Sequence, residues 1–463
     1  PPAYCRVVVV GGGASGLSAA ACLRARGEDG VVILERSESL SGSWARQYEG
    51  LRITTRRRHC GLPGWPVPPE GFCDNGCADD IAPANNTNAA SGFSIDGNSS
   101  NDNHATGAGD EMSAQSFVRY LRAYRRRFGL AAFTETEVLG AEREAVSPST
   151  RRGDAGARAG GIQVRFRWYS NVPGRGETAV SVVRCDHVVV ATGKCSSPRM
   201  PSTVLENLRG FSGEVLHSSE AKALASRAAS GGGICIVGMG NSACDLAVAL
   251  LANGVDRVHI STRSAPPIIM RQWGPLSLEW VSSRPLHNKT DYIATSPPTH
   301  HRPDSLAGTE RAVQFLPARA TDKVLSMFAA AKWGRGWRDK VFPPGVRQTW
   351  SACSSNRIPC VDKGSLVPSL LSGRIKVHGP IDWANGKTLR FRHSGATVPF
   401  ETVILATGFD SSVHGWLEPS ALNEGVRSGV VHTVGFDNGR ALLPLRQIGT
   451  DARRLAARIA PRS

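Results

Sequence analysis

The sequence predicts an α/β protein with two units, each built on a parallel sheet covered by helices. Two observations predict this fold. The order strand, glycine-rich turn and helix occurs twice, with the turns at residues 11–16 and 238–243. The chain also has 463 residues, 50 of them glycine, which is enough for two or three domains with many tight turns.

The first unit opens with Arg6–Val10, an apolar run typical of a strand buried on both faces of a parallel sheet. The turn Gly11-Gly-Gly13-Ala-Ser15-Gly16 follows, and a helix is expected over Ala14–Arg26, ended by Gly27. In such a turn the first glycine permits the bend, the second lets backbone approach a pyrophosphate, and the third lets the helix pack on the strand. The pattern predicts a Rossmann-like, dinucleotide-binding domain.

An acidic residue supports this interpretation. The next expected strand, Val31–Glu35, ends in a carboxylate about 20 residues after the turn, where such domains accept the ribose hydroxyls. Arg36 follows directly and is a further candidate contact. The alternative is a glycine turn in an α/β fold that binds no nucleotide.

Residues 74–110 interrupt this order, because they are rich in Asn, Asp, Gly and Ser and lack an apolar period. They predict a disordered polar insertion at the surface. A helix is expected over Ser116–Phe128, and a second loose stretch covers Ser147–Gly161. The strand His187–Val190 runs into Ala191-Thr192-Gly193, where small residues allow a cofactor or another backbone segment to come close. Two more strands are expected before it, at Ile162–Tyr169 and Ala179–Arg184.

The second unit repeats the first with one change. Strand Ile234–Val237 leads into Gly238-Met-Gly240-Asn241-Ser242-Ala243, a helix is expected over Asn241–Ala252, and a strand over Arg257–Thr262. Arg263, not an acid, stands at the end of that strand. A carboxylate would repel a 2′-phosphate and an Arg pairs with it, so this site is predicted to prefer NADPH to NADH. A solvated strand-end charge is the alternative.

The remainder of the chain completes the two units. Residues 264–318 are rich in Pro, His and Ser and show no clear period. The last expected strand runs into a second Ala-Thr-Gly, with Thr407 and Gly408. We expect residues 1–197 and 351–463 to form the first unit, with residues 198–350 inserted as the second. The elements expected here are helices over Asp322–Trp333 and Asp451–Ile459, and strands over Arg374–Val377, Thr388–Arg392 and Thr402–Leu405.

Composition limits the classes of partner. The formal net charge is +16, which fits an Arg-biased surface or the attraction of phosphate-bearing cofactors. No nucleic-acid-binding module is present, so nucleic acid is not expected as a partner. No apolar run is long enough to cross a bilayer, which leaves only peripheral membrane contact open.

Cysteine usage and the start of the chain bear on compartment and assembly. The 11 cysteines lack paired spacing, which predicts no metal site and favours reduced thiols in the cytoplasm. The chain does not begin with Met, so targeting information ahead of it stays open, as does the oligomeric state.

The segment between the two turns carries a resemblance. Phe211, Gly213 and His217 match the FxGxxxH pattern of the class B flavin-containing monooxygenases, although Ala221 stands where that pattern continues with an aromatic residue. Several other sites are similar to motifs of the same family: the Gly240-Asn-Ser turn with Asp245, Trp44 two residues after Gly42, and Ala406-Thr-Gly-Phe409 followed by Asp410. Within the family, the chain most resembles the plant YUCCA-type enzymes in the runs 32–37, 62–63, 120–124 and 374–377.

The resemblance implies a function. It implies FAD at the first turn and NADPH at the second, a small organic substrate, and dioxygen. It further implies that NADPH reduces the flavin and that a C4a-(hydro)peroxyflavin then transfers one oxygen atom. The substrate would be an amine or sulfide heteroatom, or an indole-3-pyruvate-like 2-oxo acid that is oxidatively decarboxylated.

Three residues are candidates at the reacting centre. Thr54, or its neighbour Thr55, occupies the region where many family members carry Asn near the flavin. Trp44 is expected beside the flavin, where packing is the simpler role. His217 is a candidate for chemistry, and the alternative is a structural histidine in the link between the domains.

Three other functions stay open. A Baeyer–Villiger-type monooxygenase shares the FxGxxxH opening but continues differently from Ser218–Ala221. A flavin disulfide reductase needs a cysteine pair near the flavin, and Ser41–Tyr48 contains no cysteine. A degenerate protein could bind FAD and NADPH without turnover.

Overall fold

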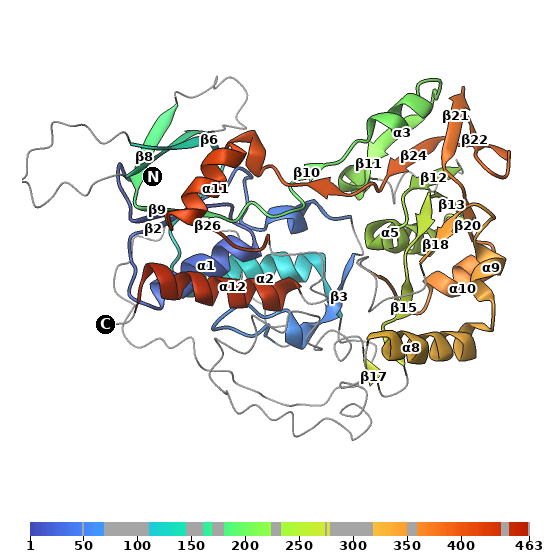
Figure 1. Cartoon of the computed structure of the whole chain (residues 1–463), viewed down its shortest axis with the longest axis horizontal. Coiled ribbons are helices and arrows are strands. Elements are labelled where there is room, and N and C mark those ends of the chain that lie inside the picture. The colour runs from blue at the N-terminus through green and yellow to red at the C-terminus, as the bar shows by residue number, and fades with distance from the viewer. Residues whose placement is uncertain are drawn as a thin grey trace, which may run out of the picture.

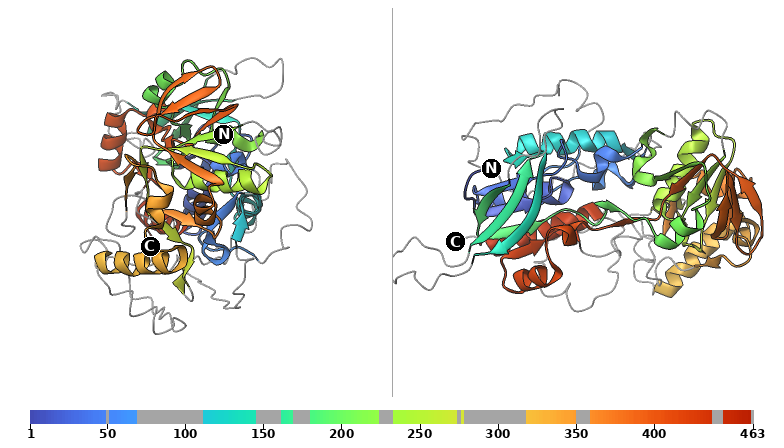
Figure 2. Two further views of the ribbon diagram at one scale, coloured as in Figure 1. Left: turned by 90° about the vertical axis from the view of Figure 1, so that its right-hand side faces the viewer. Right: turned by 90° about the horizontal axis from the view of Figure 1, so that it is seen from above.

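The structure is a computed structural model of the chain. It describes residues 1–48, 51–68, 111–144, 161–168, 180–223, 233–273, 276–277, 318–349, 359–436 and 444–461. The polar insertion expected at 74–110 lies outside the described residues, as do most of the loose stretch 147–161 and most of 264–318. Figure 1 and the right-hand view of Figure 2 show two bodies joined by a slender connection.

That connection is a pair of short strands. β10 (Ser197–Pro198) leaves one body and β25 (Phe409–Asp410) returns to it, and the two pair in antiparallel fashion. We call the body before β10 and after β25 the first unit, and the body between them the second unit. The chain therefore crosses between the units twice, side by side.

The first unit is built on a five-stranded parallel sheet in the order β26-β9-β1-β2-β5. Along β1 the valines alternate between two apolar cores, Val7 and Val9 on one face and Val8 and Val10 on the other. Both faces are covered, which explains the continuous apolar run of this strand. The strands are β1 (Val7–Val10), β2 (Val31–Leu34), β5 (Ala132–Phe133), β9 (His187–Val190) and β26 (Val431–Thr433).

Helices and smaller sheets complete this unit. α1 and α12 pack closely against one another, with α2 beside them in Figure 1. The helices are α1 (Ala14–Arg24), α2 (Ala114–Arg127), α11 (Pro419–Arg427) and α12 (Pro444–Ile459). The antiparallel strands are β6 (Thr136–Arg143), β7 (Ile162–Trp168) and β8 (Ser181–Cys185), with a separate pair β3 (Arg52–Arg56) and β4 (Glu111–Ser113).

The second unit is built on another five-stranded parallel sheet, in the order β11-β24-β12-β13-β20. Ile234 and Ile236 of β12 face one apolar core, and Cys235 and Val237 face the other. The strands are β11 (Glu214–His217), β12 (Ile234–Val237), β13 (Val258–Ser261), β20 (Ile375–His378) and β24 (Thr402–Leu405).

Helices and smaller sheets surround this sheet. The helices are α3 (Ser202–Asn207), α5 (Asn241–Ala252), α8 (Ala318–Trp333), α9 (Trp337–Val341) and α10 (Leu366–Leu371). The three-stranded antiparallel sheet consists of β21 (Ile381–Asn385), β22 (Thr388–Phe391) and β23 (Thr397–Pro399). The two-stranded pairs are β14 (Ser264–Ala265) with β18 (Arg347–Gln348), β15 (Ile268–Met270) with β19 (Cys360–Asp362), and β16 (Gln272–Trp273) with β17 (Leu276–Ser277).

The chain returns to the first unit later than residue 351, which is where the sequence predicts the return. β20 and β24 lie in the range 351–463, yet they pair with β13 and with β11 and β12 of the second sheet. The chain returns only at β25. The reason is that an apolar strand such as Thr402–Leu405 fits either parallel sheet, because its residues do not specify the partner strand.

Candidate nucleotide-binding sites

The first glycine-rich turn brings α1 against the end of β9. Gly11 has φ +107°, and a Cβ there would lie 2.6 Å from the carbonyl oxygen of Ala191. A Cβ on Gly16 would lie 1.9 Å from the carbonyl oxygen of Gly11. Only glycine fits either position, so the first turn packs directly on the first Ala-Thr-Gly segment.

The polar groups at this turn are suited to an anionic ligand. Gly13 is the N-cap of α1, and no side chain forms a capping hydrogen bond there. No acidic residue occupies the first turn of the helix. The N-terminal N–H groups of α1 are thus available to a phosphate. Ser15 is buried, and the buried Thr192 hydroxyl makes no hydrogen bond with the described residues. An unpaired buried hydroxyl is costly and points to a missing partner at this site.

Glu35 shapes the turn directly. Its carboxylate accepts hydrogen bonds from the backbone N–H of Gly12, at 2.6 Å, and of Ser37, at 2.8 Å. The side chain is buried, and a carboxylate retains lone pairs for further donors. Arg36 instead reaches toward Glu137, at 4.0 Å. The structure thus brings Glu35 to the turn and directs Arg36 to a neighbouring strand.

The second turn repeats this geometry. Gly238 has φ +110°, and a Cβ there would lie 2.5 Å from the carbonyl oxygen of Ala406. A Cβ on Gly240 would enter open space, so backbone is accessible at this point. Gly240 is the N-cap of α5 and makes no side-chain cap, and Ser242 is exposed in the first helical turn. This arrangement also fits a phosphate at a helix N-terminus.

Two side chains expected at this turn are occupied elsewhere. The Asn241 amide donates to the carbonyl oxygen of Pro359, at 3.0 Å, and accepts from the N–H of Val361, at 3.0 Å. Asp245 forms an ion pair with Lys363, at 3.2 Å. Burial raises the pKa of Asp245, and the Lys363 ammonium opposes that rise. Asn241 therefore holds α5 to β19, and only its backbone N–H remains at the turn.

Arg263 follows β13 by two residues and has an exposed side chain, as expected of a strand-end cation. Its carbonyl oxygen accepts a hydrogen bond from the backbone N–H of Arg347, at 3.3 Å, which fixes the backbone beside β18. The guanidinium is accessible from solvent and can pair with a phosphate.

The second Ala-Thr-Gly adjoins the crossing between the units. The Thr407 hydroxyl donates to the carbonyl oxygen of Arg199, at 2.5 Å, and Asp410 pairs with the Arg199 guanidinium. This ion pair lowers the pKa of Asp410. The polar side chains at this end therefore brace β10 against β25. Sequence reasoning missed Arg199, because no local pattern marks it as the partner of residues more than 200 positions away.

His217 also belongs to this crossing. One ring nitrogen lies 3.0 Å from the carbonyl oxygen of Gly408 and the other 2.9 Å from the Ser219 hydroxyl. The ring packs edge-on against Phe409, with centroids 4.9 Å apart. Burial lowers the pKa of His217, so the ring is neutral near pH 7. Because both ring nitrogens of His217 have hydrogen-bond partners, a structural role is favoured over a chemical one.

The two remaining candidates lie in the first unit. Trp44 packs edge-on against Phe117 of α2, with ring centroids 5.1 Å apart, in the apolar core beside α1. On β3 the side chains alternate, with Ile53 and Thr55 buried and Thr54 half-buried on the opposite face. Trp44 therefore has a packing role, and Thr54 is the more accessible of the two threonines.

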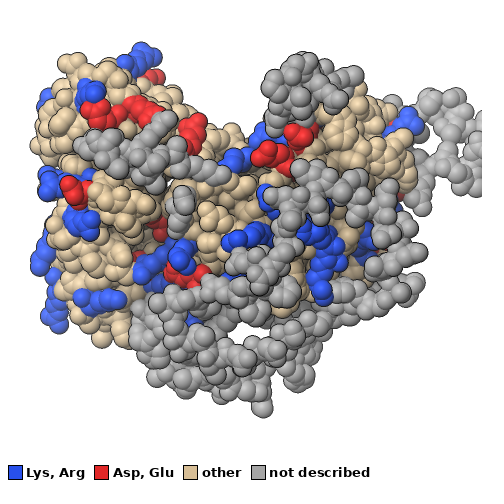
Figure 3. Space-filling model, turned by 180° about the vertical axis from the view of Figure 1, so that it is seen from behind, with Lys and Arg blue, Asp and Glu red and all other residues tan. Residues whose placement is uncertain are grey.

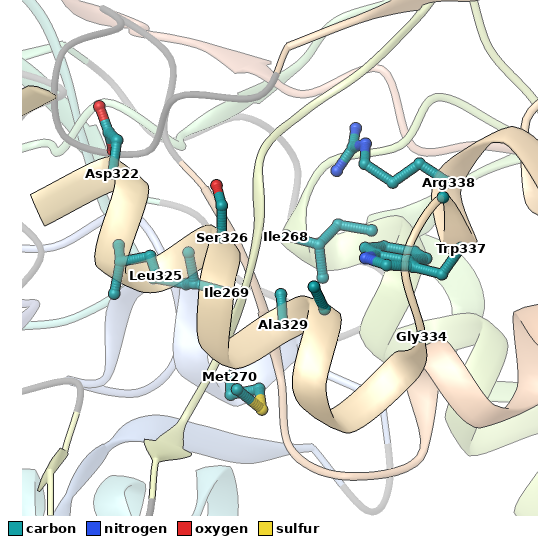
Figure 4. Close-up of a pocket in the computed structure, with 12 residues that line it drawn as sticks. Ile268, Ile269, Met270, Asp322, Leu325, Ser326, Ala329, Gly334, Trp337 and Arg338 are labelled. Carbon is teal, nitrogen blue, oxygen red and sulfur yellow. The ribbon is translucent and has the colours of Figure 1, made fainter. Parts of the chain in front are cut away.

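A pocket of about 100 Å³ is partly open to solvent. Figure 4 shows it between α8 and β15, with Ile268 and Trp337 among its apolar lining and Ser326 and Arg338 as polar groups. The Arg338 guanidinium donates to the carbonyl oxygen of Pro266, at 3.1 Å, so it is already part of a hydrogen-bond network. The pocket belongs to the second unit alone.

The surface charge is mixed on the face shown in Figure 3, where Lys and Arg are spread over both units with acidic side chains among them. Within the described ranges, no three His, Cys, Asp or Glu side chains are grouped so as to hold a metal ion. Nor does any helix in these ranges have the length and apolar character needed to span a membrane. The eight described cysteines are free thiols.

Comparisons with known proteins agree with this geometry. Residues 110–276 match the model of the flavin-binding monooxygenase-like family, and residues 9–59 match that of the NAD(P)-binding Rossmann-like domain. The chain is 27% identical over 413 residues to indole-3-pyruvate monooxygenase YUCCA1 of Oryza sativa subsp. japonica, covering 89% of this chain and 78% of that protein. It is 25% identical to the probable indole-3-pyruvate monooxygenase YUCCA3 of Arabidopsis thaliana, covering 89% and 74%.

Solved structures share the fold. A flavin-containing monooxygenase from Stenotrophomonas maltophilia has a TM-score of 0.56 at 17% identity, covering 99% of this chain and 98% of that one. A steroid monooxygenase bound to NADP has a TM-score of 0.61 at 16% identity, covering 99% and 86%. These likenesses confirm the two-domain α/β architecture.

Proposed function

Because the chain belongs to the flavin-binding monooxygenase-like family, we propose that it is an NADPH- and O2-dependent enzyme with FAD at the first turn and NADPH at the second. The observation that carries this proposal is the pair of matching turns. Each combines a glycine at positive φ, packed on an Ala-Thr-Gly strand end, with a helix N-terminus that has no side-chain cap.

The first turn would hold the FAD pyrophosphate through the N–H groups that follow Gly13, with Gly11, Ser15 and Gly16 shaping the turn. Glu35 would accept the ribose hydroxyls while it keeps its two backbone donors. The Thr192 hydroxyl, which has no partner among the described residues, would donate to the cofactor, beside Gly193. Arg36 contacts Glu137 and is a weaker candidate.

The second turn would hold the NADPH pyrophosphate through the open backbone at Gly240 and the exposed Ser242. Arg263 would pair with the 2′-phosphate, which is the group that distinguishes NADPH from NADH. Asn241 and Asp245 would act indirectly, since their side chains anchor α5 to Pro359 and to Lys363. Thr407, Gly408 and Asp410 would likewise position the strand end against Gly238.

When bound, FAD would supply the redox chemistry, with NADPH as the reductant and O2 as the oxidant, so that one oxygen atom would enter the substrate and the other would leave as water. The protein contributes binding, orientation and exclusion of water. Trp44, packed on Phe117, would provide an apolar wall beside the first turn. Thr54 is the accessible hydroxyl of β3 and is our candidate for a polar contact near the reacting centre.

We propose a small organic substrate, either a 2-oxo acid such as indole-3-pyruvate or a compound with an amine or sulfide heteroatom. The names of the plant relatives support the first class. The second class and a Baeyer–Villiger reaction on a ketone are distinguished from it by the product that forms.

The test is oxygen transfer from labelled dioxygen. The FAD-loaded protein is incubated with NADPH, ¹⁸O2 and one candidate substrate from each class: indole-3-pyruvate, a tertiary amine, a sulfide and a cyclic ketone. The proposal expects one ¹⁸O atom in one product and NADPH consumption that matches product formation. NADPH consumption that yields only hydrogen peroxide with every substrate, or none at all, would contradict it.

A further inference from the structure

We propose that charged side chains at the contact between the two units form a clamp that holds the two nucleotide sites in a fixed relation. The clamp consists of Glu111, Arg271 and Lys363, with Asp245 as an anchor. Only one part of the inference rests on the proposed function, namely that the clamp affects electron transfer between the two nucleotide sites. The four residues are positioning residues, because the contacts that define the clamp are with one another and with the backbone of β3.

The clamp begins at two neighbouring parallel strands of the second unit. Arg271 directly follows β15 and Lys363 directly follows β19, so both cations stand at the same edge of this strand pair. Arg271 forms an ion pair with Glu111 of β4, in the first unit. The Lys363 ammonium donates to the carbonyl oxygen of Arg52 on β3, at 2.9 Å. Both cations thus contact the β3–β4 pair.

Burial makes these contacts specific. The side chains of Arg271 and Glu111 are 16% and 15% exposed, so the pair is only weakly screened by salt. Removing one partner of such a pair leaves an uncompensated charge, which is strongly unfavourable. The contact is reinforced by Tyr48 of the first unit, which packs on the apolar core of the second.

Asp245 connects the clamp to the second turn. It lies one helical turn after Asn241 on α5, the helix whose N-terminus forms that turn, and it holds Lys363 at 3.2 Å. A displacement of Lys363 would therefore be transmitted to α5.

The clamp is a second attachment between the two units and would restrict hinge motion at the crossing strands. The two crossing strands, β10 and β25, form a narrow link of the kind that permits hinge motion. The clamp lies elsewhere on the contact, since Figure 1 shows β3 and β15 near one another and below β10. Two separated attachments restrict rotation about the link. Electron transfer as hydride requires the reacting atoms to approach to about 3–3.5 Å, so such restriction would set the rate.

The first experiment measures the relation between the units in cofactor-free protein. Spin labels are placed on Val182→Cys and Leu371→Cys, two exposed positions in different units, with Cys73, Cys77, Cys195 and Cys353 changed to Ser. We expect one narrow distance distribution that broadens in Glu111→Gln and in Lys363→Met. Lys363→Arg, which keeps a donor, should restore the narrow distribution. An unchanged distribution in both Glu111→Gln and Lys363→Met would overturn the proposal.

A matched control is available inside the first unit. Glu28 is 7% exposed and pairs with Arg6 at 2.7 Å, so Glu28→Gln also removes a buried charge but leaves the contact between units intact. It should leave the distance distribution as it is. Broadening in Glu28→Gln equal to that in Glu111→Gln would show a general loss of stability and would overturn the assignment of the clamp.

The second experiment separates positioning from binding. In the FAD-loaded protein without oxygen, Glu111→Gln, which leaves the Lys363–Asp245 pair at α5 in place, should slow flavin reduction at saturating NADPH by about 10- to 100-fold, while the Kd of NADP⁺ stays within about twofold. A loss of affinity with an unchanged reduction rate would overturn the positioning role. Failure of NADPH to reduce the flavin of the unmodified protein would refute the proposed function, while the spin-label result would still decide whether the clamp exists.

Discussion

Comparing Gly238→Ala with Gly254→Ala separates two reasons why the second turn requires glycine, the positive φ angle and the close contact with Ala406. Gly238 has φ +110° and lies against the carbonyl of Ala406, where a Cβ would approach the oxygen to 2.5 Å. Gly254, at the other end of α5, has φ +92°, and a Cβ there would have no neighbouring atom within 4 Å. Gly254→Ala therefore tests the backbone angle alone, and Gly238→Ala tests the angle together with the contact.

The expected magnitudes follow from these two terms. A non-glycine residue at positive φ costs about 1–2 kcal/mol in the free energy of unfolding. The contact with Ala406 involves backbone on both sides and can be relieved only by moving a strand end, which adds about 1–3 kcal/mol. We expect Gly254→Ala to lose about 1–2 kcal/mol and Gly238→Ala about 2–5 kcal/mol.

Urea denaturation of both variants gives the free energies of unfolding, and calorimetric titration gives the affinity for NADP⁺. Gly238→Ala should weaken NADP⁺ binding and leave FAD content unchanged, whereas Gly254→Ala should change neither. If the two variants lose equal stability, or if Gly238→Ala binds NADP⁺ normally, then the packing of this turn on the Ala-Thr-Gly end is not what shapes the site.

Three other expectations are accessible with single substitutions. Arg263→Gln should raise the KM for NADPH about 10-fold or more and leave the KM for NADH unchanged, because only NADPH has the 2′-phosphate. Arg257, which is exposed just before the same strand, provides the control variant Arg257→Gln. An equal rise in the KM for both nucleotides in Arg263→Gln would contradict the assignment. Thr192→Val should weaken FAD binding without loss of stability, because the hydroxyl has no partner among the described residues; unaltered FAD affinity would count against a cofactor contact. Burial and the neighbouring His259 lower the pKa of His378 from 6.5 to about 4. The contribution of His378 to stability should therefore be full above pH 6.5 and fall by roughly 3 kcal/mol as the pH approaches 4, and His378→Gln should make the pH dependence of stability less steep in urea titrations.

The local features of the fold could be predicted from the sequence, because they depend on neighbours along the chain. The helix Asn241–Ala252 and the strands Ile234–Val237 and His187–Val190 have the expected bounds. Gly27, with φ +82°, follows the end of α1 and accounts for its termination. These elements are set by apolar period and by glycine, both of which are visible in the sequence.

Long-range partners could not be predicted, because parallel strands and ion pairs leave no local trace. The assignment of β24 to the second sheet depends on its pairing with β11 and β12. The contact between Arg271 and Glu111 joins residues 160 positions apart. Asn241 has the residue type that the family motif leads one to expect, yet its amide holds β19, and only the three-dimensional contact reveals that use.

The assignment of two cofactors to the two turns is tested most directly by mixing the FAD-loaded protein with NADPH or NADH in the absence of oxygen and following the absorbance of oxidised flavin. We predict that NADPH bleaches the flavin in a saturable reaction and that NADH does so much more slowly, with the difference lost in Arg263→Gln. Protein that retains no FAD, or a bound flavin that neither nucleotide reduces, would contradict the assignment of the two turns to an electron-transferring pair of cofactors.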